Sequence, residues 1–391
     1  MSRHRPITEL FLELVAVPSP SGRERAVGER IRGWLVDAGV EAAFDGAGAV
    51  NGSDAGNLVA TVPGAAGAPV YLFVAHMDTV ETGTPAVTPR IDGDGVIRSS
   101  GDTILGADNK SAVAAVMRLC AAAAGRPVAE RPTLVAAFTC REESGRMGVS
   151  LLDLPVAVDC AFCVDGSRPI GTVITRALGQ TVFQFAIRGR TAHAAANPEA
   201  GVSAVRVAAE IVAELPLGRL AGGGSASIAA IVGGGVIDRW GDEPDVTVAL
   251  RRTPTNSVPA LALVKGEVRG YTVAEMENTV RMMEAIAARV CAAHGATYDW
   301  DWDPGRMVPP FPGAPDSQAL ALVRRAAEAI PGVTFAQEEA QATLEANYLA
   351  ASTDVVAVAS GGRDPHQLSE SIAIAELEQL EALLTAILDA G

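Results

Sequence analysis

Hydrophobic residues in the first 176 positions follow two spacings that alternate along the chain. Apolar residues three and four positions apart predict amphipathic helices, whereas short uninterrupted apolar runs predict strands buried on both faces. The predicted helices are 7–17, 23–38 and 111–124, the predicted strands are 57–62, 70–75, 133–139 and 161–164, and 83–101 is a predicted loop. This alternation indicates an α/β fold with a mostly parallel sheet covered on both faces.

The pattern changes after this region. Residues 180–188 alternate apolar and polar side chains, which is typical of a half-exposed antiparallel strand. The elements predicted next are a helix over 199–215, strands near 226–232, 246–250 and 262–269, and a helix over 273–293. A helix over 319–330, a strand over 355–359 and a helix over 374–388 then resume the first pattern.

The chain is long for a single core, because it has 391 residues. We therefore expect two domains. Residues 1–176 and 304–391 form the predicted catalytic domain, and residues 177–303 form an inserted α+β domain of ferredoxin-like order.

Charge and composition exclude some classes of partner. The net charge is −15 and the chain has no block of Lys and Arg, so nucleic acid and anionic membranes are not expected as partners. No secretory signal pattern is evident, and no apolar run approaches the roughly 20 residues of a membrane helix. The five cysteines are scattered and odd in number, which favours a reducing cytoplasm over a disulfide framework.

The predicted strand 70–75 ends in His76, with Asp78 two residues later. In an open parallel sheet, ligands bind beyond the carboxyl ends of the strands. A histidine there, with a carboxylate to hold its ring, is how metal ligands are commonly built. Taken alone, His76 is more simply a strand-end histidine bound to a backbone carbonyl.

His76 is not alone, because other acidic or imidazole residues occupy equivalent places. They follow a predicted strand or open a helix: Asp108, Glu142, Glu143, Asp165 and His366. Two histidines and three carboxylates suffice to hold two divalent cations, and a water between such cations is strongly acidified. One glutamate of the Glu142–Glu143 pair can bind a cation while its neighbour takes a proton from that water.

Four motifs carry a resemblance to a known family. They are Val-Ala-His76-Met-Asp78, Gly-Ala-Asp108-Asn-Lys, Arg-Glu142-Glu143-Ser-Gly and Val-Asp165-Gly. In combination, the sequence resembles the zinc metallopeptidase family of peptidase T, the glutamate carboxypeptidases, aminoacylases and succinyl-diaminopimelate desuccinylase. The segment 103–111, Thr-Ile-Leu-Gly-Ala-Asp-Asn-Lys-Ser, looks closest to the peptidase T branch.

The resemblance implies a role for each site residue. His76 and Asp165 would bind one Zn²⁺, Glu143 and His366 would bind the other, and Asp108 would bridge the two. Glu142 would be the general base, and Asp78 would orient His76. Mn²⁺ or Co²⁺ also suits nitrogen and oxygen ligands of this kind.

The resemblance also implies that the inserted domain is a lid through which the protein forms a homodimer. In the Thr191-Ala-His193-Ala motif, His193 would polarise the scissile carbonyl, in its own subunit or in its neighbour. Asn256 and Arg269 would lie near the substrate, although a salt bridge within the lid is an equal alternative for Arg269. Asn347 falls in a segment, 342–347, that replaces the family's usual Gly-Gly-Ser/Thr-Asp, so this departure concerns the substrate pocket rather than the cations.

These observations predict a cytoplasmic di-zinc hydrolase that cleaves an amide bond of a small peptide or N-acyl amino acid. A peptidase T-like aminopeptidase is the first choice. A carboxypeptidase or an N-acyl-amino-acid deacylase of the same family is the alternative. A non-catalytic binding protein on this fold, or a protein with a single structural cation, is the rival from another class.

Overall fold

The computed structural model describes residues 5–80, 86–234, 246–251 and 253–390. The chain divides into two compact units, each of which is described by itself. Unit 1 comprises residues 1–177, 313–340 and 344–391, and unit 2 comprises residues 178–312 and 341–343. The role of the inserted residues as a lid and dimerisation domain stays a prediction.

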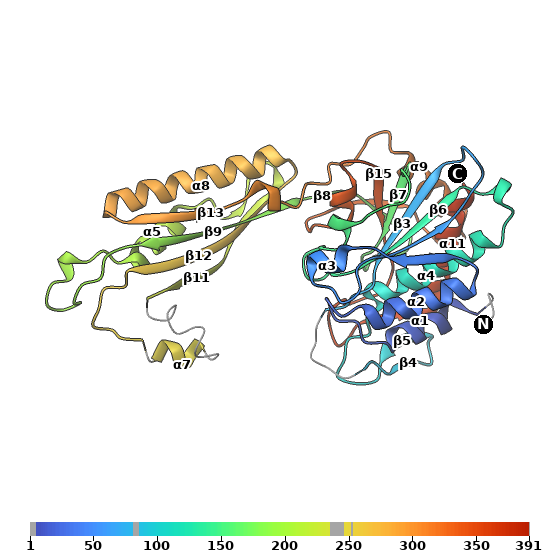
Figure 1. Ribbon diagram of the computed structural model, residues 1–391, viewed down its shortest axis with the longest axis horizontal. Helices are drawn as coiled ribbons and strands as arrows, with labels where there is room; N and C mark the ends of the chain where they lie inside the picture. Colours follow the sequence, from blue (N-terminus) through green and yellow to red (C-terminus); the bar gives the residue numbers. More distant parts are fainter. Residues whose placement is uncertain (1–4, 81–85, 235–245, 252, 391) are drawn as a thin grey trace. The chain divides into compact units, whose positions relative to one another are not determined.

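Within the described residues, unit 1 is built on an eight-stranded sheet (Figure 1). Its central strands β6, β3, β7 and β15 are neighbours in that order and run parallel. The strands, in sheet order, are β1 (Glu41–Phe44), β2 (Leu58–Val62), β6 (Thr133–Thr139), β3 (Val70–His76), β7 (Cys160–Val164), β15 (Asp354–Val358), β8 (Thr172–Ala177) and β14 (Ala336–Ala340). This mostly parallel sheet confirms the predicted α/β class.

The apolar runs form central strands because both of their faces are buried. In β3, Phe73 faces one side of the sheet while Leu72 and Val74 face the other, and all three are fully buried. Phe73 also stacks on Phe162 of β7, with ring centroids 4.8 Å apart. Such strands gain from apolar burial on each face, which is why they read as continuous hydrophobic runs.

Helices α1, α4 and α11 pack against one another, and α4 also contacts β3 and β6 (Figure 1). The helices of unit 1 are α1 (Ile7–Val15), α2 (Arg25–Asp37), α3 (Ala47–Asn51), α4 (Ala107–Ala124), α9 (Gln318–Glu328), α10 (Ala346–Leu349) and α11 (Ile374–Asp389). Their buried residues recur at helical spacing, as the sequence predicts. Among the described residues, no helix is both long and apolar enough to cross a lipid bilayer.

The predicted loop over 83–101 is wrong in part. Its described residues include two short strands, β4 (Pro89–Ile91) and β5 (Val96–Ser99), which pair with each other. Strand β5 also pairs with β16 (Ser371–Ala373). Strands this short carry too few apolar residues to show a period. Residues 83–85 of the predicted loop lie outside the described residues.

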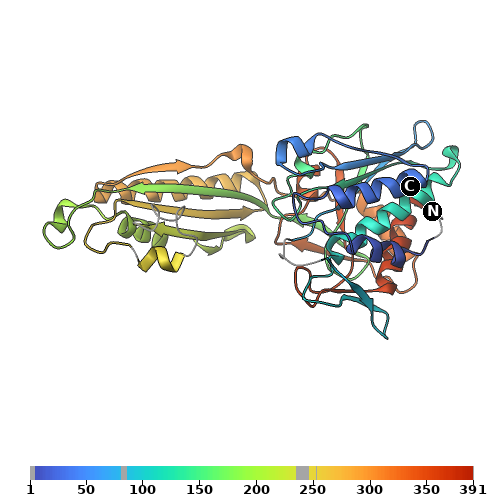
Figure 2. The same ribbon diagram turned by 60° about the horizontal axis from the view of Figure 1, so that its bottom comes forward.

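Unit 2 contains an antiparallel sheet with the order β10-β11-β12-β9-β13 (Figure 2). The strands are β9 (Gly179–Arg188), β10 (Gly218–Arg219), β11 (Ser225–Gly233), β12 (Leu261–Gly270) and β13 (Thr297–Asp301). Helices α5 (Ala204–Glu214) and α8 (Val273–His294) pack on each other and on this sheet. The alternating side chains Phe183, Phe185 and Ile187 of β9 are buried in the resulting core, as the sequence pattern predicts.

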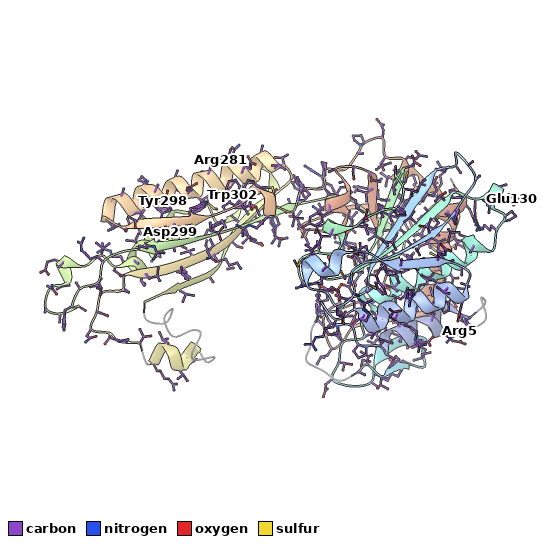
Figure 3. The ribbon with its side chains drawn as sticks, viewed as in Figure 1. Arg5, Glu130, Arg281, Tyr298, Asp299 and Trp302 are labelled. Carbon is purple, nitrogen blue, oxygen red and sulfur yellow. The ribbon has the colours of Figure 1, made fainter. Side chains whose placement is uncertain are left out.

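Aromatic side chains of and beside β13 complete this second core. Trp300 stacks on Phe183 and Phe185 at centroid distances of 5.4 and 5.0 Å. Tyr298 and Trp302, which are labelled in Figure 3, are partly buried against the same cluster, and Trp302 Nε1 donates a hydrogen bond to Thr181 Oγ1 at 2.9 Å.

The strand predicted near 246–250 is wrong, since this segment is helix α7 (Val246–Arg251). A short apolar run such as Val-Thr-Val-Ala-Leu does not distinguish a strand from a helix by its period. Residues 235–245 and 252, which include the Trp240-Gly-Asp-Glu-Pro segment, lie outside the described residues.

Candidate metal centre

The predicted site residues of unit 1 lie at one edge of its sheet. His76 is the last residue of β3, Asp165 directly follows β7, Glu142 and Glu143 follow β6, and His366 lies in the loop after β15. Because these four strands are adjacent and parallel, their carboxyl ends meet at the same edge. The prediction that the residues lie at strand ends therefore agrees with their position in the sheet.

Asp108, near the start of α4, lies between the two histidines. Its Oδ1 is 3.1 Å from His76 Nε2, and its Oδ2 is 3.5 Å from His366 Nε2. The same nitrogen of each ring also faces a further carboxylate. Asp165 Oδ1 is 3.9 Å from His76 Nε2, and Glu143 Oε1 is 2.8 Å from His366 Nε2.

Among the described residues, three overlapping groups have candidate ligand atoms that all lie within 4.8 Å of one another, and two of these groups contain Asp108. One group is His76, Asp108 and Asp165, and the other is Asp108, Glu143 and His366. Asp108 belongs to both. A single carboxylate with one oxygen toward each histidine is the arrangement that a bridging ligand needs.

The ring of His76 is held in one orientation. Its Nδ1 donates to the backbone oxygen of Asp78 at 3.0 Å, while the nearer carboxylate oxygen of Asp78 is 3.5 Å away. A hydrogen bond at Nδ1 leaves Nε2 as the nitrogen that faces Asp108 and Asp165. Asp78 thus orients the ring through its backbone more closely than through its side chain.

The buried carboxylate of Asp78 has further partners. It accepts hydrogen bonds from the backbone N–H groups of Glu142 at 3.0 Å and Glu143 at 3.1 Å, and from the Ser21 hydroxyl. Asp78 therefore contacts both the histidine at the end of β3 and the loop that follows β6.

Charges in this cluster shift one another's pKa values. The hydrogen bond to Asp108 is the main cause that raises the pKa of His366 to about 9. Burial raises the pKa of Glu143 to about 7 and, together with the charge of Asp108, raises that of Asp165 well above its usual value. Burial acts against ionisation of Asp108, but its hydrogen bonds to His366 and His76 hold its pKa well below the usual range.

Glu142 is 5% exposed and lies beside an arginine four residues further along the chain. The Nε atom of Arg146 is 2.9 Å from Glu142 Oε1. Glu142, His76 and Glu143 form the third group of candidate ligand atoms. The direct contact to His366 distinguishes the two glutamates, because it belongs to Glu143 while Glu142 contacts Arg146.

The loops that carry these residues have unusual backbone angles. Among the described residues, the non-glycine residues with left-handed φ are Arg141 at 55°, Arg146 at 58°, Asp364 at 54° and His366 at 64°. All four lie in the two loops that carry Glu142, Glu143 and His366. Such conformations cluster at functional sites, where the surrounding structure holds them.

The remaining predicted residues lie in unit 2, apart from Asn347. The Nδ1 atom of His193 accepts hydrogen bonds from the backbone N–H groups of Ala195 and Ala196 at 3.2 and 3.1 Å. The neutral ring therefore carries its proton on Nε2, which is free to donate. Asn256 is an exposed residue whose backbone oxygen accepts from Ala194 N at 2.9 Å, so it lies beside the His193 loop.

Two predicted substrate residues have partners within the chain. Arg269 forms an ion pair with Glu267 at 2.8 Å, which is the lid salt bridge considered as its alternative role. Asn347 is fully buried, and its Oδ1 accepts a hydrogen bond from Leu344 N at 2.7 Å. Contact of either residue with a substrate stays a prediction.

The sequence did not single out several charged residues near the site that are buried or partly buried. Glu24 and Glu370 contact the backbone of the site loops, and Arg146 contacts Glu142. Burial lowers the pKa of Lys110 to about 7 and raises that of Glu345 to about 7. Glu345 lies in the segment that departs from the family pattern. Lys110 and Arg146 stand in or beside the four motifs, whereas Glu24, Glu345 and Glu370 lie outside them and carried no sequence signal.

Comparison with known proteins agrees with this geometry. Residues 72–390 match the model of peptidase family M20/M25/M40. An aminopeptidase PepT from Bacillus cereus has the same fold with a TM-score of 0.85 and 30% identity, covering 100% of this chain and 99% of that one. A tripeptidase from Staphylococcus aureus, 24% identical, shares the fold with a TM-score of 0.85 over 100% and 98% of the two chains. The uncharacterized protein YqjE of Bacillus subtilis is 28% identical over 391 residues, which is 100% of this chain and 99% of that protein.

The fold and the cluster at its sheet edge define a hydrolytic enzyme of the metal-dependent peptidase class. The chain belongs to peptidase family M20/M25/M40. The resemblance found in the motifs is thereby confirmed. The YXEP protein of Bacillus subtilis, which shares the fold at 18% identity with a TM-score of 0.67 over 98% and 96% of the two chains, is described as a dinuclear metal binding peptidase from the M20 family.

Proposed function

We propose that this protein is an aminopeptidase that removes the N-terminal residue from small peptides with the help of two divalent cations. The observation that carries the proposal is the placement of Asp108, whose two carboxylate oxygens face two different histidines. The relationship to PepT over the whole chain supports the choice of an aminopeptidase.

The donor set fits two cations. Each candidate position offers one imidazole nitrogen and carboxylate oxygens, which is the ligand chemistry of Zn²⁺ and also suits Mn²⁺ and Co²⁺. His76 and Asp165 would hold one cation, Glu143 and His366 would hold the other, and Asp108 would hold both. We propose zinc as the cation. When bound, the pair would supply polarisation of the carbonyl and acidification of water.

Glu142 is the proposed general base. Its carboxylate lies close to His76 and Glu143, which belong to the two ligand groups, but it forms an ion pair with Arg146 and has no direct contact with His366 among the described contacts. In the proposed reaction it accepts a proton from the attacking water and returns this proton to the amine nitrogen that leaves. Asp78 keeps the base in place, because it accepts the backbone N–H of Glu142.

We further propose that His193 donates a hydrogen bond from Nε2 to the carbonyl oxygen as negative charge develops on it. Its two backbone hydrogen bonds at Nδ1 support this role, since they fix the tautomer that can donate. The roles of Asn256, Arg269 and Asn347 in binding substrate, a homodimer formed through unit 2, and a cytoplasmic location remain proposals of the same kind.

The aminopeptidase proposal is tested with a free tripeptide and its N-acetylated form, using the Zn²⁺-loaded protein and mass spectrometry of the products. We expect release of the first residue from the free peptide and no cleavage of the acetylated one. Loss of the acetyl group would instead identify a deacylase. Release of the last residue from both peptides would identify a carboxypeptidase.

The substitution His193→Ala is expected to lower kcat by about 10²-fold, which is typical for the loss of one oxyanion donor. Because His193 is exposed, its removal should leave the melting temperature unchanged. The matched control is Asn197→Ala. This substitution removes the side-chain oxygen that accepts from the backbone N–H of His193, but it leaves the imidazole ring in the chain. An unchanged kcat in His193→Ala would argue against the oxyanion role.

A further inference from the structure

Two buried carboxylates outside the ligand groups hold the backbone of the loops that carry the candidate ligands. Glu24 is 0% exposed and Glu370 is 2% exposed. Neither belongs to any of the groups of candidate ligand atoms within the described residues. Glu24 is 117 residues from Arg141 and Glu370 is 262 residues from Asp108 in the sequence, although Glu370 shares a loop with His366.

Glu24, which directly precedes α2, binds the loop after β6. Its Oε1 accepts from the backbone N–H of Arg141 at 3.0 Å and of Gly22 at 2.7 Å, and its Oε2 accepts from Ser53 Oγ at 2.6 Å. The next two backbone N–H groups, those of Glu142 and Glu143, donate hydrogen bonds to the carboxylate of Asp78. Three consecutive amides of this loop are therefore bound by buried carboxylates.

Glu370, which directly precedes β16, binds the turn before α4 in the same manner. Its Oε2 accepts from the backbone N–H of Gly106 at 2.7 Å, and its Oε1 accepts from the backbone N–H of Asp108 at 3.0 Å. Each oxygen of this carboxylate has a separate amide donor. The two hydrogen bonds hold the backbone on both sides of Ala107, and so they hold the Asp108 Cα atom from which the side chain extends.

We propose that Glu24 and Glu370 are positioning residues of the active site. Glu24 sets the position of the base Glu142, and Glu370 sets the position of the bridging ligand Asp108. This proposal rests on the proposed function. It adds a role for Glu24, which lies in the N-terminal segment outside the residues matched by the family comparison. Partners that hold metal ligands in place typically account for about 10–100-fold in affinity or activity.

The hydrogen-bond pattern predicts opposite outcomes for one kind of substitution. In Glu24→Gln the remaining oxygen can still accept from both backbone amides, Arg141 N and Gly22 N, and only the Ser53 hydroxyl loses its acceptor. In Glu370→Gln one of the two backbone amides must face an NH₂ group and loses its acceptor. We expect Glu24→Gln to retain most of its activity, whereas Glu24→Ala should lower kcat by about 10–100-fold with little change in KM.

For Glu370→Gln we expect Zn²⁺ affinity to fall by about 10–100-fold, measured by competition with a chromophoric chelator, and turnover to recover when free Zn²⁺ is raised. The matched control is Asp354→Asn. Asp354 also accepts from a hydroxyl, Ser317 Oγ at 2.7 Å, and from a backbone amide, Ala319 N at 3.0 Å, but it lies at the opposite end of β15 from the site. The control should change the melting temperature without changing Zn²⁺ affinity or kcat.

The positioning role of Glu370 would be overturned if Glu370→Gln bound Zn²⁺ as tightly as the wild type. The positioning role of Glu24 would be overturned if Glu24→Ala and the control Asp354→Asn lost kcat equally. If the wild-type protein bound two Zn²⁺ but cleaved no peptide, the aminopeptidase proposal would fail. The Zn²⁺ affinity of Glu370→Gln would still decide the positioning role, because that readout does not depend on turnover.

Discussion

The substitution Glu142→Gln is expected to lower kcat by up to about 10⁴-fold while leaving cation binding intact. Glutamine has nearly the same shape as glutamate but cannot accept the proton of the attacking water. The backbone N–H of residue 142 would still donate to Asp78, so the loop should keep its conformation. The measurement is steady-state hydrolysis of a free tripeptide, with the cation content of the same sample found by elemental analysis.

A control substitution separates loss of the base from a general loss of acidic charge. Glu41→Gln changes an exposed glutamate on β1, the edge strand of the same sheet, and should leave kcat unchanged. Two outcomes would count against the proposed role of Glu142. One is a variant with full turnover, and the other is a variant whose activity loss matches its loss of cations.

The placement of the candidate ligands was largely predictable because it depends on topology. The strands that lead to His76, Asp165 and His366 are continuous apolar runs, which can be recognised as buried strands from the local sequence alone. Neighbouring parallel strands have their carboxyl ends at the same edge of a sheet. The doubled glutamate after β6 stood out for the same reason. Only local sequence and the rules of parallel sheets were needed for this part of the site.

The supporting contacts could not be predicted in the same way. Glu370 and Asp108 are 262 residues apart, and their contact joins a side chain to a backbone amide, which leaves no trace in residue type at the receiving position. The tautomer of His193 likewise depends on two backbone N–H groups that only a folded loop brings near the ring. Helix α7 was misassigned because a short apolar run has no distinctive period.

The substitution Asp108→Ala is expected to reduce the bound cations from two per chain to one or none and to bring turnover below detection. Asp108 is the residue that both ligand groups share, so its loss removes a ligand from each. It also removes the negative charge that would lie between two closely spaced cations and offset their repulsion. Elemental analysis after dialysis gives the cation count, and Asp102→Ala, which changes an exposed aspartate of the same segment, is the control.

The same substitution has a second expected effect that is independent of any cation. In the cation-free protein the hydrogen bond to Asp108 is the largest cause that raises the pKa of His366 to about 9. A nearby anion favours the protonated imidazole, so Asp108→Ala should lower this pKa toward the ordinary value for histidine, about 6.5. Titration of His366 by NMR would measure it. A lowered pKa in a folded variant that still binds two cations would show that Asp108 contacts His366 without bridging the pair, and the two-cation assignment would then have to exclude Asp108.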